Sequence, residues 1–548
     1  MHTLRLGAAL ALALTTACSS SHGATTLPLT PTAPTSGGGN PVTGTQASLR
    51  ITVPRAGTAT SSTTRRPRYV SPSSAKLLVA VNGGTTTTYG LTPSTPGCTV
   101  QVTTLLCTFA IPAPSGPDTL AMSLTDGAGN VLSRNVVTAT LAPGVATPVA
   151  VTLAGVPTSV AVVPGANATV DGTKAPYHVA GLFAQPVEIE PLDADGNVII
   201  GPGAPTITGA TISAGSAYAA IASAQTTDPN AYVLRAVDGS AGGHTVTVSA
   251  TAQGVPLADG TTSAPISATT DFAYTPAIAV ANGLVVNVFS LESQKIVAQF
   301  RSCVCAGLTF TRDLKVDSKG QLYALTLSFL GLSQTGIVNV FAPGATAAGS
   351  AITSGVHVAA ALALDKNDNL YVVNGSGFRQ PPPSLSKYAR GTTTPAFTIS
   401  GSAAQISQPA GLAVDASGNI YLSEENGSIN VYAPGTTVPA QVLSDPSLTQ
   451  PGSIALDAAG GLYVADAANE DIAYFAPGSS TLTSTLSDPS FSNWNGNSYL
   501  MVDGGGNLWS SVAASPGEVE EIGAAGLPNT VSVVNVISGV AGPMAIIP

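Results

Sequence analysis

Residues 273–548 repeat a short pattern, and this repeat constrains the fold more than any other feature of the chain. Each unit has an apolar strand, an Asp-x-x-Gly turn and a second apolar strand that carries an aromatic residue, as in Leu412–Tyr421. A third strand that ends in Pro-Gly follows, as in Val431–Gly435. The Asp of the turn recurs at Asp317, Asp365, Asp415, Asp457 and Asp503. These positions span 186 residues in four steps of 46.5 on average. The region therefore holds about six units, and radially arranged units of four short strands predict a six-bladed β-propeller.

The two ends of this region complement each other. Gly542–Ile547 looks like the opening strand of a unit whose turn is missing, and Ala277–Phe289 looks like a unit without its first strand. We therefore expect one blade to be built from both ends, which would remove two open sheet edges.

The pattern resembles the NHL repeat, whose consensus has Gly-Val-Ala-Val-Asp, a turn Gly and then Ile-Tyr-Val-Ala-Asp. Ile454–Asp471 is the nearest match, with Tyr463-Val464-Ala465-Asp466 intact. The resemblance covers about half of the chain and implies a six-bladed fold, but it says little about function. Animal NHL proteins that bind RNA use basic faces, which this chain lacks.

The charge distribution argues against nucleic acid as a partner. The net charge is −10, and the last Lys or Arg is Arg390. Residues 391–548 contain 13 Asp and Glu but no Lys, Arg or His, so they cannot neutralise phosphates.

The N-terminus has the pattern of an export signal. His2 and Arg5 precede the apolar run Leu6–Leu14, and small residues then lead to Cys18. This arrangement resembles the bacterial lipobox, although Thr15 stands where Leu is usual. The resemblance implies a signal peptide at 1–17, lipidation of Cys18 and attachment to a membrane, and Ser19 implies no retention at the inner membrane. We expect an exported cell-envelope lipoprotein of the outer membrane or cell surface. The alternative is an ordinary signal peptide with an incidental Cys.

The rest of the chain also favours β-structure. Charged residues make up only 9% of the chain, against about 25% in typical domains, and Thr, Val, Ser and Gly are abundant. After a Ser/Thr/Gly/Pro-rich linker at 18–46, alternating strands predict a β-sandwich at 47–155 and a second at 156–272. The second resembles bacterial Ig-like spacer domains. The predicted fold class is therefore all-β, with two N-terminal Ig-like β-sandwiches before a six-bladed β-propeller.

The remaining cysteines form two close pairs. Cys98 and Cys107 are separated by residues typical of a hairpin, and we expect a disulfide between them in an oxidising compartment. Cys303 and Cys305 stand too close together for the sequence to decide their state.

Catalytic patterns are few in the repeat region. The recurring Asp residues predict turn caps, and the aromatic residue of each unit predicts packing between blades. The region has one His, His357, which excludes the several-His metal site of the peptidyl-hydroxyglycine lyases that this repeat resembles. A calcium-dependent hydrolase or lactonase of the SMP-30 type stays open as the alternative function, with calcium as the possible cofactor.

The least repetitive loops predict where a ligand binds. In a propeller, the loops between second and third strands and the links between blades share one face. The primary hypothesis is a monomeric binding or scaffold protein for a protein, peptide or glycan, without catalytic residues. The predicted ligand residues are Phe378, Arg379, Glu424, Glu425, Asn426, Asp466, Asn469, Glu470, Asp471 and Trp494.

Overall fold

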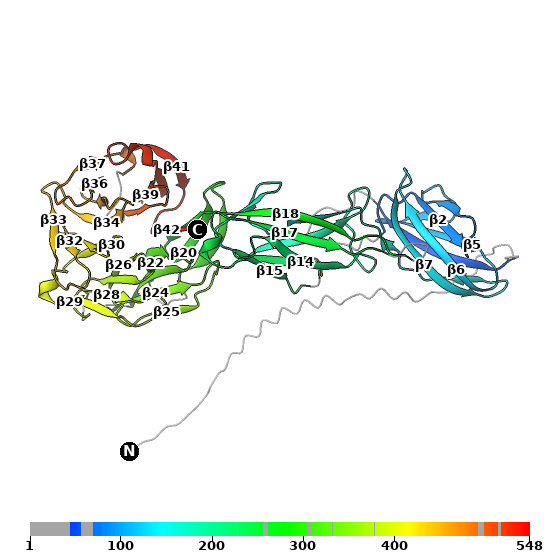
Figure 1. The fold of residues 1–548 in the computed structure, drawn as a ribbon, viewed down its shortest axis with the longest axis horizontal. Helices are drawn as coiled ribbons and strands as arrows, with labels where there is room; N and C mark the ends of the chain where they lie inside the picture. Colours follow the sequence, from blue (N-terminus) through cyan, green and yellow to red (C-terminus); the bar gives the residue numbers. More distant parts are fainter. Residues whose placement is uncertain are drawn as a thin grey trace, which may run out of the picture.

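The chain is all-β in the computed structural model, which describes residues 44–55, 70–226, 228–255, 261–303, 308–330, 333–377, 379–491, 498–512 and 517–548. Its ten sheets form an elongated molecule with an N-terminal part, a middle part and a β-propeller, in that order (Figure 1). Helical structure in the described residues is limited to four single 3-10 turns. None of the described helices is long and apolar enough to cross a membrane.

The N-terminal part contains two sheets with a shared core. Their strand orders are β4-β5-β1-β8 and β3-β2-β6-β7-β9. Inward-facing positions alternate along the longer strands β1, β2, β5 and β6, and their side chains meet in one hydrophobic cluster that includes Leu49, Leu77, Phe109 and Leu120. The strands are β1 (Gln46–Pro54), β2 (Lys76–Val81), β3 (Thr87–Gly90), β4 (Cys98–Val100), β5 (Thr104–Pro112), β6 (Gly116–Thr125), β7 (Val131–Leu141), β8 (Ala146–Pro148) and β9 (Ala154–Gly155).

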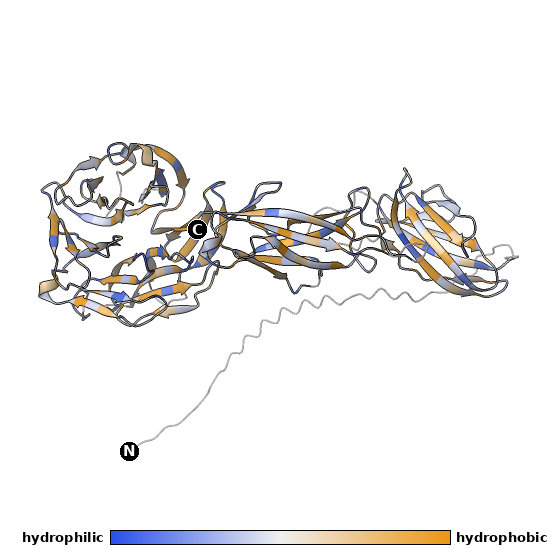
Figure 2. Ribbon diagram, in the orientation of Figure 1, coloured by the Kyte–Doolittle hydropathy of each residue, from blue (hydrophilic) through white to orange (hydrophobic). Residues whose placement is uncertain are grey.

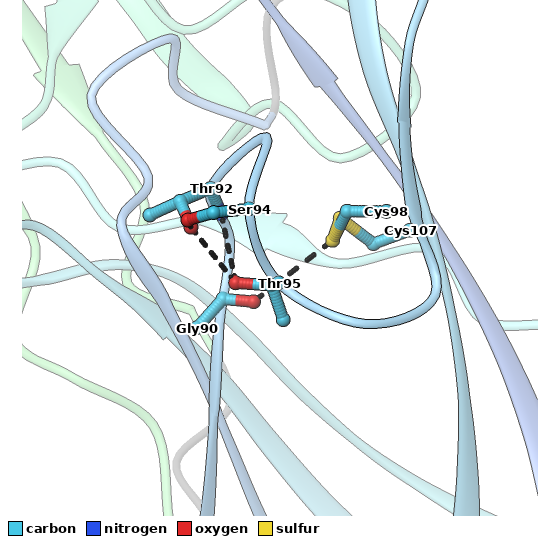
Figure 3. The surroundings of a disulfide bond; sticks show 6 residues. All are labelled: Gly90, Thr92, Ser94, Thr95, Cys98 and Cys107. Carbon is cyan, nitrogen blue, oxygen red and sulfur yellow. Dashed lines mark hydrogen bonds between the residues drawn. A yellow bond between two sulfur atoms is a disulfide. The ribbon is translucent and has the colours of Figure 1, made fainter.

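Cys98 and Cys107 are joined by a disulfide within the first of these sheets. They are directly opposite in the β4–β5 pair, and their Cα atoms are 4.0 Å apart. The loop before Cys98 is closed by hydroxyl contacts of Thr92 with Ser94 and Thr95 (Figure 3). Cys303 is also disulfide-bonded, whereas Cys305 lies outside the described residues.

The middle part again pairs two sheets, in the orders β10-β13-β16-β15 and β11-β12-β18-β17-β14. The segment 193–197 is a hairpin turn, because Asp193 Oδ1 accepts hydrogen bonds from the backbone N–H groups of Asp195 and Asn197. The elements are β10 (Ser159–Pro164), β11 (Val170–Asp171), β12 (Tyr177–Ala180), β13 (Gln185–Leu192), β14 (Ile207–Ala214), β15 (Ala219–Ser223), β16 (Ala231–Ala236), η1 (Gly239–Ala241), β17 (Thr245–Ala252) and β18 (Ile266–Thr275).

The C-terminal half forms six four-stranded antiparallel sheets, the blades of the propeller. Blades 1 to 3 contain β42 (Met544–Ile547), β19 (Ala277–Asn282), β20 (Val285–Ser290) and β21 (Ile296–Arg301); β22 (Leu308–Val316), β23 (Leu322–Leu330), β24 (Ser333–Phe341) and β25 (Ser350–Ile352); and β26 (Ala359–Leu364), β27 (Leu370–Asn374), β28 (Ser384–Tyr388) and β29 (Phe397–Ser400).

Blades 4 to 6 repeat this four-strand order. They contain β30 (Pro409–Val414), β31 (Ile420–Glu424), β32 (Ser428–Tyr432) and β33 (Gln441–Ser444); β34 (Pro451–Leu456), β35 (Leu462–Asp466), β36 (Asp471–Phe475) and β37 (Ser484–Leu486); and β38 (Tyr499–Val502), β39 (Leu508–Val512), β40 (Glu518–Ile522) and β41 (Val533–Ser538). The links between strands include η2 (Ser402–Ala404), η3 (Pro489–Phe491) and η4 (Ala524–Gly526).

Blade 1 is shared by both ends of the region, which confirms the prediction from the sequence. β42 pairs antiparallel with β19, so that Val280 lies opposite Met544 and Ala277 opposite Ile547. The red strand β42 therefore meets the green strands of blade 1 (Figure 1).

The recurring Asp residues cap turns, as their spacing predicts. In all five units one carboxylate oxygen accepts hydrogen bonds from the backbone N–H groups two and four residues later, at 2.7–3.0 Å. In the Asp365 unit the glycine is replaced by Asp368, which keeps a positive φ of 61°. The Asp368 carboxylate accepts hydrogen bonds from Ser318 in the neighbouring blade, a contact that favours this strained conformation.

The aromatic residue of each unit packs in a core between blades. Tyr323 lies in a cluster with Leu362 of blade 3, and Tyr371 lies in one with Leu412 of blade 4. Trp509 is completely buried, and its indole N–H donates to Asp503. Hydrophobic residues are present along the strands of all three parts of the molecule (Figure 2).

The middle part packs against two blades of the propeller. One hydrophobic cluster includes Leu182 and Phe183 of the middle part together with Leu314 and Phe341 of blade 2. Polar contacts surround it: the Gly239 N–H donates to the Lys319 carbonyl at 2.7 Å, and Lys319 Nζ is 3.3 Å from Asp238 Oδ2. The middle part and the propeller are therefore joined by a common hydrophobic core and not only by a flexible linker.

Candidate functional site

The propeller has two faces of different construction. We call "turn face" the face with the Asp turns between first and second strands and with the turns between third and fourth strands. We call "loop face" the opposite face, which has the loops between second and third strands and the links between blades. The alternation of antiparallel strands places these connections on opposite faces, and hydrogen bonds join the loops to the links directly.

The middle part occupies the turn face at blades 1 and 2. Its contacts reach Lys319 in an Asp turn, Gly344 in a turn between third and fourth strands, and Ser290 and Glu292 in the β20–β21 turn. His178 Nδ1 of the middle part lies 2.5 Å from Glu292 Oε2. The loop face therefore faces away from these contacts.

Two predicted ligand residues hold the loop face together. Glu424 and Asp466 are the last residues of β31 and β35, and both side chains are completely buried. Glu424 accepts hydrogen bonds from the backbone of Ser407 and Gln408, and Asp466 accepts them from the backbone of Thr449 and Gln450. Each carboxylate thus ties its loop to the link that precedes its blade.

Asn374, at the same position of β27, makes the corresponding contacts in blade 3. Its side chain accepts from the His357 N–H at 3.0 Å and donates to the Gly355 carbonyl at 2.9 Å. The sequence signal for this set is recurrence, because the three residues each follow the aromatic residue of their unit by three positions.

The other described ligand candidates lie on the surface of the loop face. Glu425, Asn426, Asn469 and Glu470 are exposed beside β31 and β35. Arg379 is exposed in the loop after β27 and has a φ of 58°. Asn469 Nδ2 donates to Asp466, so this loop is internally bonded.

Asp471 is half-buried opposite Asp466 in the β35–β36 pair. Burial, with a further contribution from the Asp466 charge, raises the pKa of Asp471 to about 6. Phe378 and Trp494, the predicted aromatic contacts, lie outside the described residues.

The central channel has a polar cavity of about 50 Å³ at its loop-face end. Residues from five first strands line it, β22, β26, β30, β34 and β38, together with Glu425 and Ala467, which directly follow β31 and β35. The first strands begin on the loop face, so the cavity is the mouth of the channel there.

Three of the charged residues at this mouth, Arg312, Asp313 and Lys315, come from β22, and the fourth is Glu425. Lys315 Nζ lies 2.6 Å from Asp313 Oδ1, and Asp313 Oδ2 accepts from the Leu362 N–H at 2.7 Å. Asp313 therefore neutralises Lys315 and also joins blade 2 to blade 3. The Arg312 guanidinium is half-buried beside this pair and forms no hydrogen bond or ion pair with another described residue.

Tyr499, at the start of β38, interacts electrostatically with Arg312 and Asp313. Burial raises the pKa of the Tyr499 hydroxyl, while the Arg312 charge lowers it and the Asp313 charge raises it. The phenol is therefore a neutral hydrogen-bond donor at physiological pH.

Sequence reasoning missed this cluster. A sequence signal for this cluster was present, however. Arg312-Asp313 stands where the next unit has Ala360-Ala361 and the following unit has Ala410-Gly411. A charged pair in one unit of an otherwise apolar inner strand indicates a position that the fold alone does not require.

No three His, Cys, Asp or Glu among the described residues are placed to share a metal ion. The buried imidazole of His357 receives a favourable contact from the Pro382 carbonyl, whereas its Nε2 has no partner among the described residues. Burial lowers the pKa of His357. The ring therefore bridges a link and a loop of the loop face.

Comparison with known proteins finds only distant structural similarities. The sequence matches no protein-family model and no curated protein. Similar solved structures include a chain of a nidogen/laminin complex, with a TM-score of 0.38 and 13% identity over 50% of this chain and 98% of that chain. A protein of unknown function from Bacteroides caccae has the same score and identity, over 50% and 99%. A chain of a mitotic checkpoint complex has a TM-score of 0.34 and 12% identity, over 47% and 74%. These distant similarities assign neither a family nor a ligand.

Proposed function

We propose that this chain is an exported binding protein that presents a ligand site on the loop face of its β-propeller. The observation that carries the proposal is the division of the two faces. The middle part covers turn-face residues of blades 1 and 2, whereas the loop face has a polar channel mouth and exposed, non-repetitive loops. Concave polar sites within an apolar frame are typical of ligand sites.

The two sheet pairs before the propeller are, in this proposal, Ig-like β-sandwiches that act as spacers, and the propeller is of NHL type. The shared core of each pair and the elongated arrangement support a spacer role (Figure 1). The turn chemistry and the Tyr-Val-Ala-Asp sequence at 463–466 support the NHL assignment.

The anchor is proposed to be a lipid on Cys18, which lies outside the described residues. A Ser/Thr/Gly/Pro-rich tether at 18–46 would hold the folded parts away from the membrane. Metabolic labelling with a fatty acid tests this step: we expect the parent chain to be labelled and Cys18→Ala not to be. Equal labelling of both would contradict lipidation.

The ligand class is proposed to be a protein, peptide or glycan, bound with help from Phe378 and Trp494. A binding screen of peptides and glycans on the full chain is the direct test. Any ligand found should lose affinity in the Phe378→Ala, Trp494→Ala double variant, without a comparable change in thermal unfolding. Binding that survives this double variant, or that the N-terminal sheet pairs alone retain, would place the site elsewhere.

A further inference from the structure

The channel mouth combines three hydrogen-bond donors that have no partner among the described residues. The first is the Arg312 guanidinium of blade 2, which forms no hydrogen bond or ion pair with another described residue. The others are on blade 6: the Ser498 hydroxyl, and the Tyr499 hydroxyl, which has no hydrogen-bond partner among the described residues. All three residues line the same cavity.

Ser498 is the most informative of the three. Its side chain is 6% exposed, and its Oγ has no partner within the described part of the chain. A buried polar atom without a hydrogen bond is energetically unfavourable. Its counterpart Gly452, across the blade 5–blade 6 boundary, is close enough that an added Cβ would lie 3.2 Å from Ser498 Oγ, so the hydroxyl lies against the backbone of the cavity wall.

We propose that this mouth binds a carboxylate group of the ligand, with Arg312 as its ion-pair partner and with Ser498 and Tyr499 as further donors. The inference rests on the proposed function, because it takes the loop face as the ligand-bearing face. A guanidinium binds a carboxylate through two parallel N–H bonds, and the neutral hydroxyls can donate to the same oxygens.

The size of the cavity limits the group that enters it. A bound water needs about 10–15 Å³ of such volume, so a cavity of about 50 Å³ has room for a small group such as a carboxylate and a water. The bulk of the ligand would therefore stay outside, among the exposed loops, and only its acidic group would reach Arg312.

The charge of the mouth favours a monoanion. Lys315 is already neutralised by Asp313, which leaves Arg312 as the available cation among the lining residues. Glu425 lies at the exposed rim, and its negative charge disfavours a dianion such as phosphate.

The test uses the full chain and two small probes that differ only in charge, N-acetylglycine and its neutral amide. Binding is measured by calorimetry and by ligand-observed NMR. We expect the acid to bind and the amide to bind at least roughly tenfold more weakly. Arg312→Gln should weaken binding of the acid at least roughly tenfold, and Ser498→Ala should weaken it several-fold.

Lys366→Gln is the matched control, because it also removes one positive charge, from an exposed Lys on the turn face. It should leave the affinity unchanged. If Arg312→Gln does not fold, Arg312→Lys replaces it, since Lys retains the charge but loses the bidentate geometry and should bind several-fold more weakly.

The proposal is overturned if acid and amide bind equally, if neither binds, if inorganic phosphate binds more tightly than the acid, or if the Arg312 and Ser498 variants bind like the parent. A peptide or glycan that binds the loop face while N-acetylglycine does not would leave the proposed function standing and remove only the carboxylate site. Absence of binding to all of them would remove both.

Discussion

The turn face and the loop face of the propeller differ in how strictly the repeat controls them. On the turn face, five Asp residues make the same pair of backbone hydrogen bonds, and even the unit without glycine keeps the conformation through Asp368. On the loop face, the corresponding structural position is Asn374, Glu424 and Asp466 in successive blades, and the loops around it differ in sequence. The turn face is constrained by a common turn. On the loop face each blade joins its loop to the preceding link with a different residue, so the loops there vary in sequence.

The strongest test of this comparison is Asp466→Ala on the loop face. The substitution leaves the Thr449 and Gln450 N–H groups without their buried acceptor, so we expect a loss of about 3 kcal/mol in the free energy of unfolding. Urea unfolding measures it. The control is Glu425→Ala, an exposed neighbour on the same face, which should change stability by less than about 0.5 kcal/mol. Similar effects of both substitutions would mean that Asp466 does not hold the loops.

The turn face is tested by Asp415→Ala. Its carboxylate accepts from the N–H groups of Ser417 and Asn419, each at 2.8 Å, in a partly exposed turn. We expect a loss of about 1–2 kcal/mol, smaller than for Asp466 because water can replace part of the contact. Ser417→Ala keeps the N–H donor and should be close to neutral. A loss for Asp415→Ala above that for Asp466→Ala would reverse the comparison.

Asp471→Asn should stabilise the protein. Because burial raises the pKa of Asp471 to about 6, above its unfolded value of about 4, the folded state is penalised whenever the carboxyl is ionised. The gain should be about 1–2 kcal/mol at pH 7 and should fade as the pH falls from 6 to below 4, where both states are protonated. Unfolding curves of parent and variant across this range measure the difference. A gain that is independent of pH would show that charge is not the cause.

His357→Gln should have the smallest effect, and only on the acid side of neutrality. Burial lowers the pKa of His357 below 6.5, so the folded state resists protonation. The contribution of this residue is constant above pH 6.5 and is lost as the pH falls below that value, because the unfolded chain takes up the proton first. The stability difference between parent and variant should therefore change between pH 7 and pH 5. A constant difference would contradict this account.

The propeller could be predicted well from the sequence because the spacing and period of the repeat determine the turns and the number of blades. The Asp-x-x-Gly spacing specifies the turn, the period specifies the number of blades, and the incomplete units at 277–289 and 542–547 specify the closure. The aromatic residues and the Asp caps occupy the structural positions that strict recurrence indicates.

The candidate site was less accessible to sequence reasoning. Spacing correctly grouped the loops and links on one face, but it could not distinguish the buried Glu424 from the exposed Glu425, since the two are neighbours at the end of the same strand. The Arg312 cluster also escaped, because its members are 186 positions apart in the chain and meet only when blades 2 and 6 converge on the channel.

The shared blade also determines when the propeller can become complete. Val280 pairs with Met544, a residue synthesised 264 positions later, so the channel-side edge of β19 stays open while the other five blades form. The entropic cost of closing a loop rises slowly with its length, by about 0.6 kcal/mol per doubling. A pairing between such distant residues nevertheless forms late and slowly. During this interval the unpaired edge of β19 is a template for strands of other molecules. Capture of β42 is thus both the final step of assembly and the step that ends the risk of aggregation.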